Sequence, residues 1–335
     1  MKKKYIIPIF IPNSGCRYRC IYCNQTSQTG VLKYSISSIE AVIKYYLKIK
    51  KEWDEIAFYG GTFCGLDFDV QSELLKIAGK YLENGSINGI RFSTSPELID
   101  ESNASFYRKS RVTTIEIGVQ SMDNEILAFS GRKHSSYDVF KASEIVKKNN
   151  ITLGIQLMTG LPLETDEKLA ETIKSIVKIK PDFIRIYPVL VFKNTALFQM
   201  YKNGVYIPDS LEEAVIKCMG ITDICLREKI DIIRIGVQLS DLDGFVSGPY
   251  HPSFGFIVHS RLFRAKLEKS IQKLYGKNRK KDFILNLNKR DFPLFYGFKG
   301  ENKEYFKRNY PKIEIEPLIN NNIKKNSFFI DYEKV

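Results

Sequence analysis

The chain has 335 residues, of which 44% are hydrophobic, enough for one large core and a small second module. Its 51 Lys and Arg outnumber 38 Asp and Glu, and this formal net charge of +13 suggests a polyanionic partner. No run of about 18 uncharged apolar residues occurs, so we expect no membrane span. No signal-peptide cleavage site follows the first apolar segment, which predicts a cytoplasmic protein. Three of the six cysteines lie within eight residues, a pattern that argues against a disulfide framework and favours metal ligands.

Short β-branched and aromatic segments alternate with amphipathic helical segments along most of the chain. Strands are expected at 5–12, 55–60, 89–94, 113–119, 151–158, 183–190 and 231–237. Helices are expected at 37–50, 69–83, 136–149, 165–179 and 211–228. Parallel strands need helical crossovers, so the alternation predicts an α/β fold, a partial or full (βα) barrel with its chemistry at the carboxyl ends of the strands.

The alternation ends near Gly276. A Gly/Pro-bearing loop followed by a basic helix occupies 246–275. We therefore expect a barrel at 1–245, a linker loop and helix at 246–275, and a small basic α+β module at 276–335.

Cys16, Cys20 and Cys23 follow the first strand with the spacing C-x3-C-x2-C. Three thiolates can bind three irons of a [4Fe–4S] cluster and leave the fourth iron without a protein ligand. The alternative is a structural zinc site, which needs four ligands, and Cys64 is the only other candidate, at a distance.

The second strand ends in Gly60, Gly61 and Thr62. Two glycines expose main-chain groups that can approach a ligand closely, although a plain strand-to-helix turn would use them too.

These motifs, with Glu116-Ile-Gly-Val-Gln120-Ser and Gly160-Leu-Pro162, resemble the radical S-adenosylmethionine (SAM) superfamily over about residues 5–260. They most resemble the branch that contains oxygen-independent coproporphyrinogen III oxidase and the catalytic subunit of Elongator. The resemblance implies a [4Fe–4S] cluster on the three cysteines and SAM on its open iron, which together generate a 5′-deoxyadenosyl radical. It also implies a low-potential electron donor such as ferredoxin or flavodoxin.

The same resemblance implies a SAM pocket. Main-chain groups of the Gly60-Gly61-Thr62 segment would hold the SAM amino group, and the aromatic residue before the third cysteine would seat adenine. The remaining implied contacts are polar: Gln120 in the pocket, Arg132 on the SAM carboxylate, and Gln156 at the ribose position, where the porphyrin enzymes have Asp. The aromatic residue is Tyr22. Alternatively, Gln120 and Gln156 only cap strands at a barrel mouth.

The segments 91–97, 184–188, 210–214 and 248–255 resemble Elongator rather than the porphyrin enzymes. Elongator spaces its first two cysteines further apart, however, and shows Arg and Asp where this chain has Ser95 and Glu97. The resemblance does not extend to an acetyltransferase domain, so acetyl-CoA chemistry is not expected. The extra cysteine of the porphyrin branch is replaced by Gln25.

Two further residues have two interpretations each. His251, in the Gly/Pro loop, is a candidate for proton exchange with the substrate, or else a histidine of a turn. Arg234, on the last expected strand, either contacts phosphate or belongs to a salt bridge in the barrel.

The C-terminal region is strongly basic. Between 277 and 312 it has eleven Lys and Arg and four Asp and Glu, a net charge of +7. A strand at 283–287, helices at 292–296 and 301–309, and strands at 313–316 and 327–332 surround Gly297-Phe-Lys299-Gly300. This order resembles a KH domain, whose GxxG loop clamps single-stranded nucleic acid; a solvated basic cap is the alternative.

Three functions fit the sequence. The first is a radical SAM enzyme that modifies RNA, with transfer RNA (tRNA) as the favoured substrate. The second is a radical SAM enzyme that acts on a small molecule such as a porphyrin precursor. The third is a non-catalytic RNA-binding protein with a structural cluster.

Overall fold

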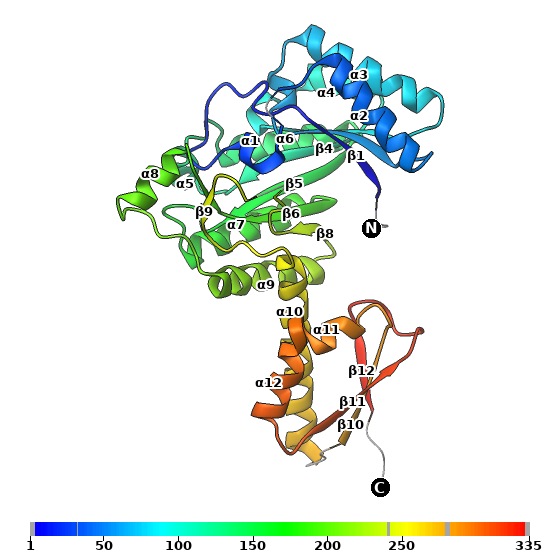
Figure 1. The fold of residues 1–335 in the computed structure, drawn as a ribbon, viewed down its shortest axis with the longest axis vertical. Coiled ribbons are helices and arrows are strands. Elements are labelled where there is room, and N and C mark those ends of the chain that lie inside the picture. Colours follow the sequence, from blue (N-terminus) through cyan, green and yellow to red (C-terminus); the bar gives the residue numbers. More distant parts are fainter. Residues whose placement is uncertain (1–3, 32, 240–241, 279–281, 332–335) are drawn as a thin grey trace. The chain divides into compact units, whose positions relative to one another are not determined.

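The structure is a computed structural model that describes residues 4–31, 33–239, 242–278 and 282–331 (Figure 1). It forms two compact units, one made of Met1–Ala214 with Ile224–Tyr250, the other of Val215–Asp223 with His251–Val335. The domain boundaries inferred from the sequence stay a prediction. Arg279, Lys280 and Lys281 of the basic region lie outside the described residues. Within the described chain, no helix is both long and apolar enough to cross a membrane.

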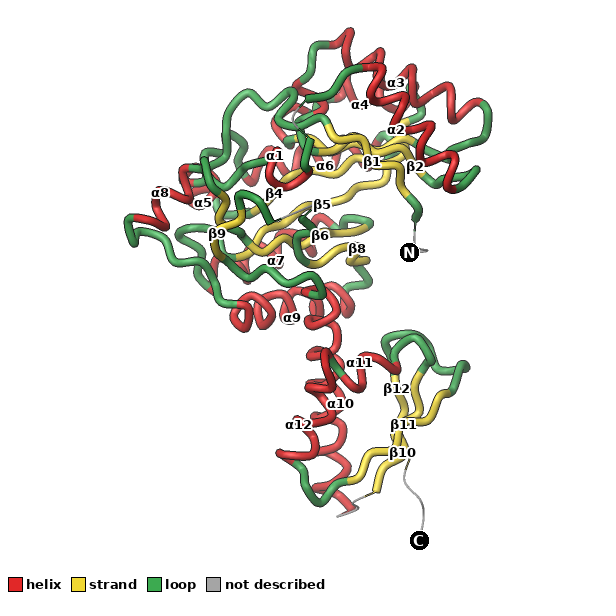
Figure 2. The backbone as a smooth tube through the Cα atoms, in the orientation of Figure 1, coloured by secondary structure: helices red, strands yellow, loops and turns green. Residues whose placement is uncertain are grey.

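The first unit contains a seven-stranded sheet with the order β1-β2-β3-β4-β5-β6-β8 (Figure 2). Its strands are β1 (Ile6–Phe10), β2 (Glu55–Tyr59), β3 (Ile90–Thr94), β4 (Val112–Gln120), β5 (Thr152–Thr159), β6 (Phe183–Pro188) and β8 (Asp231–Ile235). All neighbouring strands run parallel. The expected α/β barrel is confirmed, in its partial form: the sheet curls into a half-barrel with β1 and β8 at its two edges.

Helices connect successive strands, and several of them contact strands of the sheet. They are α2 (Ile36–Ile49), α3 (Phe68–Glu83), α4 (Glu101–Lys109), α6 (Ser136–Lys148) and α7 (Asp166–Ile179), followed by α9 (Leu211–Arg227). Ser35, Asp100 and Ser135 begin α2, α4 and α6 with reciprocal side-chain caps, which satisfy main-chain N–H groups that a helix start leaves free.

Several short elements escaped the sequence analysis. They are α1 (Gln25–Thr29), α5 (Asn124–Phe129), α8 (Ala196–Lys202) and the antiparallel pair of β7 (Val191–Phe192) and β9 (Phe245–Ser247). Elements of two to seven residues carry too few positions to show a period of 2.0 or 3.6. The helix α4 is longer, but its mean hydropathy is low and it buries only Ala104 and Tyr107.

The two faces of the half-barrel differ sharply in polarity. Outward positions hold buried aliphatic and aromatic side chains, such as Phe58, Ile117 and Ile155, which pack under the helices. Inward positions on the same strands hold Glu55, Arg91, Thr114, Glu116, Gln156 and Arg185. Parallel strands covered on both faces are usually apolar throughout. The polar lining therefore marks the inside of the half-barrel as the candidate site.

The second unit contains α10 (Phe254–Asn278), β10 (Asp282–Leu287), α11 (Phe292–Tyr296), a 3-10 turn (Phe298–Gly300), α12 (Glu301–Asn309), β11 (Glu314–Ile319) and β12 (Phe328–Asp331). The strand β10 lies in the centre, parallel to β11 and antiparallel to β12. Leu267 and Ile271 of α10 pack with Phe283, Leu285 and Phe306 in one apolar core. The long helix α10 is therefore part of this unit's core.

Candidate functional site

The loop that carries the three cysteines is fixed to the end of β2 by main-chain contacts. Asn13 N donates to Gly60 O and Thr62 N donates to Ser14 O, each at 2.8 Å. A side chain at Gly61 would place its Cβ 2.4 Å from Ser14 O, and one at Gly15 would lie 2.2 Å from Thr62 O. Only glycine fits between the two segments, so the predicted Gly60-Gly61-Thr62 motif shapes the cysteine loop.

Each thiol of this loop has a polar neighbour. Cys16 Sγ lies 3.3 Å from Thr62 Oγ1, Cys20 Sγ accepts from Arg132 at 3.5 Å, and Cys23 Sγ accepts from Gln25 at 3.7 Å. Burial, and then the neighbouring Cys20 and Cys16, raise the pKa of Cys23 to about 12. The charges of the three cysteines therefore influence one another. Within the described residues, no three metal-ligating side chains are gathered closely enough to hold an ion.

Cys64 has separate surroundings. Its main-chain N donates to Thr94 Oγ1 at 3.3 Å. Burial raises the pKa of its thiol to about 11, and hydrogen bonds to Thr94 and Tyr107 oppose that rise. Nothing in the described chain joins Cys64 to the other cysteines as the fourth ligand that a structural zinc site needs.

Arg132 links the cysteine loop to the end of β4. Its NH2 group donates to Gly118 O at 2.7 Å and to Ser95 Oγ at 3.0 Å, and its NH1 group donates to Cys20 Sγ. Its Nε donates to His134 Nδ1 at 3.3 Å. Arg132 thus holds the end of β4 against the cysteine loop, and its role toward a ligand stays a prediction.

His134 was missed by the sequence analysis. It is one of only three histidines, and its place two residues after Arg132 was the available signal. Its side chain is fully buried, and its Nε2 lies 3.2 Å from Val119 O. Because a carbonyl only accepts, Nε2 carries the proton and Nδ1 is free to accept from Arg132. Burial first, and then Arg132, lower the pKa of His134 to about 3, so the ring stays neutral.

We expect His134→Gln to remove a pH dependence of stability. Gln keeps a donor near Val119 O but does not titrate. In the parent, the pKa of His134 is depressed in the folded state. The stability that the neutral ring contributes is therefore fully present above about pH 6.5 and is lost as the pH falls, by about 1 kcal/mol per unit. Urea unfolding between pH 7.5 and 5 should show a shallower slope in the variant. An equal slope in both proteins would contradict a buried neutral ring.

Tyr22 and Gln120 flank this region. The Tyr22 ring packs with Ile126 and Leu161, and its buried hydroxyl has no hydrogen-bond partner in the described part of the chain. Gln120 ends β4 with a φ of 65°. A Cβ at Gly118 would lie 3.0 Å from the Gln120 amide and 3.5 Å from Arg132. Glycine at 118 therefore leaves the space in which both polar groups sit.

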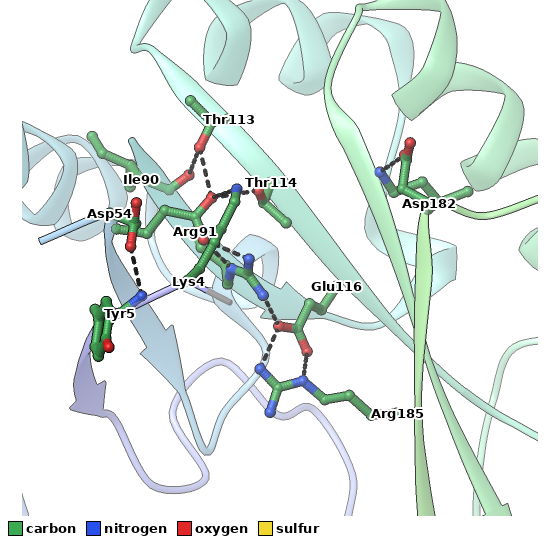
Figure 3. Close-up of polar contacts among 12 residues, drawn as sticks. Lys4, Tyr5, Asp54, Ile90, Arg91, Thr113, Thr114, Glu116, Asp182 and Arg185 are labelled. Carbon is green, nitrogen blue, oxygen red and sulfur yellow. Dashed lines mark hydrogen bonds and ion pairs between the residues drawn. The ribbon is translucent and has the colours of Figure 1, made fainter. Parts of the chain in front are cut away.

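A chain of alternating charges crosses the inside of the half-barrel, from Lys4 through Glu55, Arg91 and Glu116 to Arg185 (Figure 3). Arg91 donates to Glu55 Oε2 at 2.7 Å and to Glu116 Oε1 at 2.8 Å. Thr114 also donates to Glu55, at 2.7 Å. Burial alone would raise the pKa of Glu116, but Arg185 and Arg91 outweigh it and hold the pKa below its ordinary value.

The carboxylate of Glu116 is the centre of this network. Besides the two arginines, it accepts from Tyr59 at 2.9 Å and from the Gln156 amide nitrogen at 2.8 Å. The Arg185 Nε lies 2.8 Å from its Oε2 and NH2 lies 2.9 Å from its Oε1. One N–H of the Gln156 amide is therefore engaged by Glu116, which leaves its second N–H and its carbonyl oxygen for a ligand.

The remaining candidate residues lie in the second unit. The His251 ring meets Phe298 edge-on at 4.8 Å, and its Nδ1 accepts from Ser253 N at 2.9 Å. Gly297, Lys299 and Gly300 all have positive φ angles. A side chain at Gly297 would collide with Asn302, whereas one at Gly300 would meet nothing within 4 Å. The main chain at Gly300 is thus open to close approach, and the roles of His251 and the GxxG loop stay predictions.

A curled half-barrel of parallel strands, with three cysteines in the loop after its first strand, defines a radical SAM enzyme. Residues 10–176 match the radical SAM superfamily model, and residues 181–264 match the model of the radical SAM C-terminal domain. The chain belongs to the radical SAM superfamily, whose members bind a [4Fe–4S] cluster and SAM. Three free thiols in one loop are the donor set that such a cluster needs.

Relatives of this chain include proteins that act on tRNA. The tRNA uridine(34) acetyltransferase of Methanocaldococcus jannaschii is 32% identical over 181 residues, which are 48% of this chain and 34% of that protein. The chain thus spans about a third of that relative's length. The structure of Methanocaldococcus infernus Elp3 matches 83% of this chain and 66% of its own, with 23% identity and a TM-score of 0.61. Coproporphyrinogen III oxidase from Escherichia coli matches 68% and 53%, with 17% identity and a TM-score of 0.52.

Proposed function

We propose that this radical SAM enzyme modifies RNA and that its substrate is tRNA. The observation that carries the proposal is the open GxxG loop of the second unit, in which Lys299 stands between Gly297 and Gly300. The similarity to tRNA uridine(34) acetyltransferases over about half of this chain supports the same substrate class. Those relatives are much longer, so the reaction that they perform is not transferred to this chain.

In this proposal Cys16, Cys20 and Cys23 would each bind one iron of the cluster, and the fourth iron would be left for SAM. When bound, the cluster supplies the electron that cleaves SAM reductively to a 5′-deoxyadenosyl radical. A low-potential donor of the ferredoxin or flavodoxin type would deliver that electron. The main-chain contacts between the Gly60-Gly61-Thr62 segment and the loop would fix the path of the loop that carries the three thiols.

The neighbouring polar groups have complementary roles toward SAM. Arg132, fixed by Gly118, Ser95 and His134, would bind the SAM carboxylate. Gln120 lies beside it, and Tyr22 contributes an apolar ring next to Cys20. Gln156, whose nitrogen donates to Glu116, would accept a ribose hydroxyl on its carbonyl oxygen. A carbonyl can thus replace the carboxylate of the porphyrin enzymes at this position.

The second unit would hold the RNA. Its order of β10, α11, GxxG turn, α12 and β11 places the glycine turn at the start of α12, where no side chain caps the first main-chain N–H groups. Lys299 adds a positive charge within the turn, and Lys303 and Lys307 follow on α12. An open glycine, uncapped N–H groups and lysines are features that suit a phosphodiester backbone.

We expect Lys299→Glu to weaken tRNA binding about tenfold at moderate salt, because it replaces a phosphate contact by a repulsion. The measurement is a titration of unfractionated tRNA at several salt concentrations. Lys289→Glu, an exposed lysine in the turn after β10, is the matched control and should weaken binding far less.

Equal losses in both variants would show that only overall charge matters.

The function itself is tested by comparing tRNA nucleosides, by mass spectrometry, between a strain that lacks the protein and its parent. One nucleoside should be missing or changed. An unaltered nucleoside profile, with SAM cleavage intact, would favour a small-molecule substrate, whereas SAM binding without cleavage would favour a non-catalytic protein.

A further inference from the structure

A row of side chains crosses the inner face of the half-barrel at one level. Gly118 of β4 is the register partner of Gln156 on β5, Gln156 is the partner of Arg185 on β6, and Arg185 is the partner of Arg234 on β8. Register partners of a parallel sheet project to the same face. Gln156 and Arg185 both reach Glu116 inside the half-barrel. The register of β8 shifts by one residue between Ile232 and Arg234, and this irregularity brings Arg234 opposite Arg185 on the inner face.

The two ends of this row differ. At the β4 end, Gly118 O accepts from Arg132, which also contacts Cys20, so this end belongs to the cysteine loop. At the other end, β8 is the last strand of the sheet. Neighbouring strands lie about 4.8 Å apart, so Arg185 and Arg234 stand one and two strands beyond Gln156, on the side away from the cysteines.

The two arginines have different partners. Arg185 is anchored, because its Nε and NH2 groups bind Glu116 and NH2 also donates to Tyr59. Arg234 is half-buried and donates to the neutral Gln238 side chain at 3.2 Å. Among the described residues, no carboxylate is paired with Arg234.

The inner face therefore carries an excess of positive charge. Four cations start from this face, namely Lys4, Arg91, Arg185 and Arg234, against the three carboxylates of Glu55, Glu116 and Asp231, the last of which is the register partner of Phe183. The contact between Arg234 and Gln238 is open to solvent, so an anion can reach this guanidinium and supply the counter-charge that it lacks. Arginine's planar fork also suits the oxygens of a phosphate.

We propose that Arg234, supported by Arg185, forms an anion site inside the half-barrel that binds a phosphate group of the substrate. The site rests on the proposed function for its ligand, which is a backbone phosphate beside the nucleoside to be modified. Arg132 serves the SAM carboxylate at the opposite end of the row, so the two anions are separated by Gln156. The substrate phosphate then fixes which nucleoside stands opposite the SAM ribose.

Arg234→Gln is the informative variant, because Arg185 also supports Glu116 and its loss would disturb the fold. Arg108→Gln, on the exposed last turn of α4, removes the same charge elsewhere and is the control. The probes are inorganic pyrophosphate, followed by calorimetry, and unfractionated tRNA, titrated at several salt concentrations. Thermal melting of both variants confirms that they fold.

We expect Arg234→Gln to weaken pyrophosphate binding about tenfold, to weaken tRNA binding similarly and to lower the salt slope by about one. Arg234→Lys, which keeps the charge without the fork, should recover part of the pyrophosphate affinity. If the parent binds pyrophosphate through Arg234 but does not bind tRNA, the anion site stands and its ligand comes from a smaller phosphorylated substrate. If Arg234→Gln matches Arg108→Gln with both probes, the proposed site is wrong.

Discussion

Alanine at Cys16, Cys20 or Cys23 should abolish iron–sulfur incorporation and reductive SAM cleavage. Each thiolate would bind one iron of the cluster, and the loop holds no spare cysteine or histidine to replace it. The measurements are the iron and sulfide content of anaerobically purified protein and the formation of 5′-deoxyadenosine. Both should fall to background in each of the three variants.

Cys64→Ala is the matched control for these variants. The partners of Cys64 are Thr94 and Tyr107 instead of the three thiols, so its replacement should leave iron and sulfide content unchanged. If the parent instead contained one zinc and no sulfide, and lost that zinc in Cys64→Ala, a four-cysteine zinc site would replace the cluster assignment.

Glu116→Ala should destabilise the fold by about 3–5 kcal/mol, because it leaves two buried arginines without their common carboxylate. Glu116→Gln keeps the size of the side chain but removes the charge, so it should also destabilise strongly. Urea unfolding at pH 7 measures the change in the free energy of unfolding. Glu171→Gln, which removes an exposed partner of Lys174, should change it by less than about 1 kcal/mol.

The Glu116 carboxylate also determines how the stability of the parent protein falls at acid pH. The pKa of Glu116 is depressed in the folded chain, so its stabilising effect is present above its ordinary pKa and is lost as the pH falls through the folded value. The parent should therefore lose stability steeply below about pH 4.5, and Glu116→Gln should lose less. Equal acid sensitivity in both proteins would contradict the charged network.

The strands of the sheet were predictable because outward Ile, Val and Phe recur along each of them between turn residues. The cysteine spacing was equally informative, since three ligands for four irons is a local pattern. Which of the inward-facing side chains contact one another was not predictable from the sequence. Glu55, Glu116 and Arg185 are far apart in the sequence, and only the register of the strands makes them neighbours.

His134 shows the same limit at shorter range. Its two ring nitrogens join Arg132 to Val119 only because β4 ends with Gln120 in a left-handed conformation and the chain returns past it. Ser95 and Glu97, which depart from the Elongator pattern, form a hydrogen bond with each other at 2.5 Å, and Ser95 also accepts from Arg132. Ser95 and Glu97 therefore change the hydrogen bonds that position Arg132, but Ser95 still offers it an acceptor.

The main-chain contacts of Gly15 and Gly61 at the end of β2 bear on whether the chain folds before it receives its cluster. In small zinc domains, metal binding drives folding, and the chain without metal is unfolded. Here main-chain contacts with the end of β2 and the packing of Tyr22 with Ile126 and Leu161 hold the cysteine loop. We therefore expect the chain to fold before a cluster is inserted, so that protein without a cluster still unfolds cooperatively instead of lacking structure.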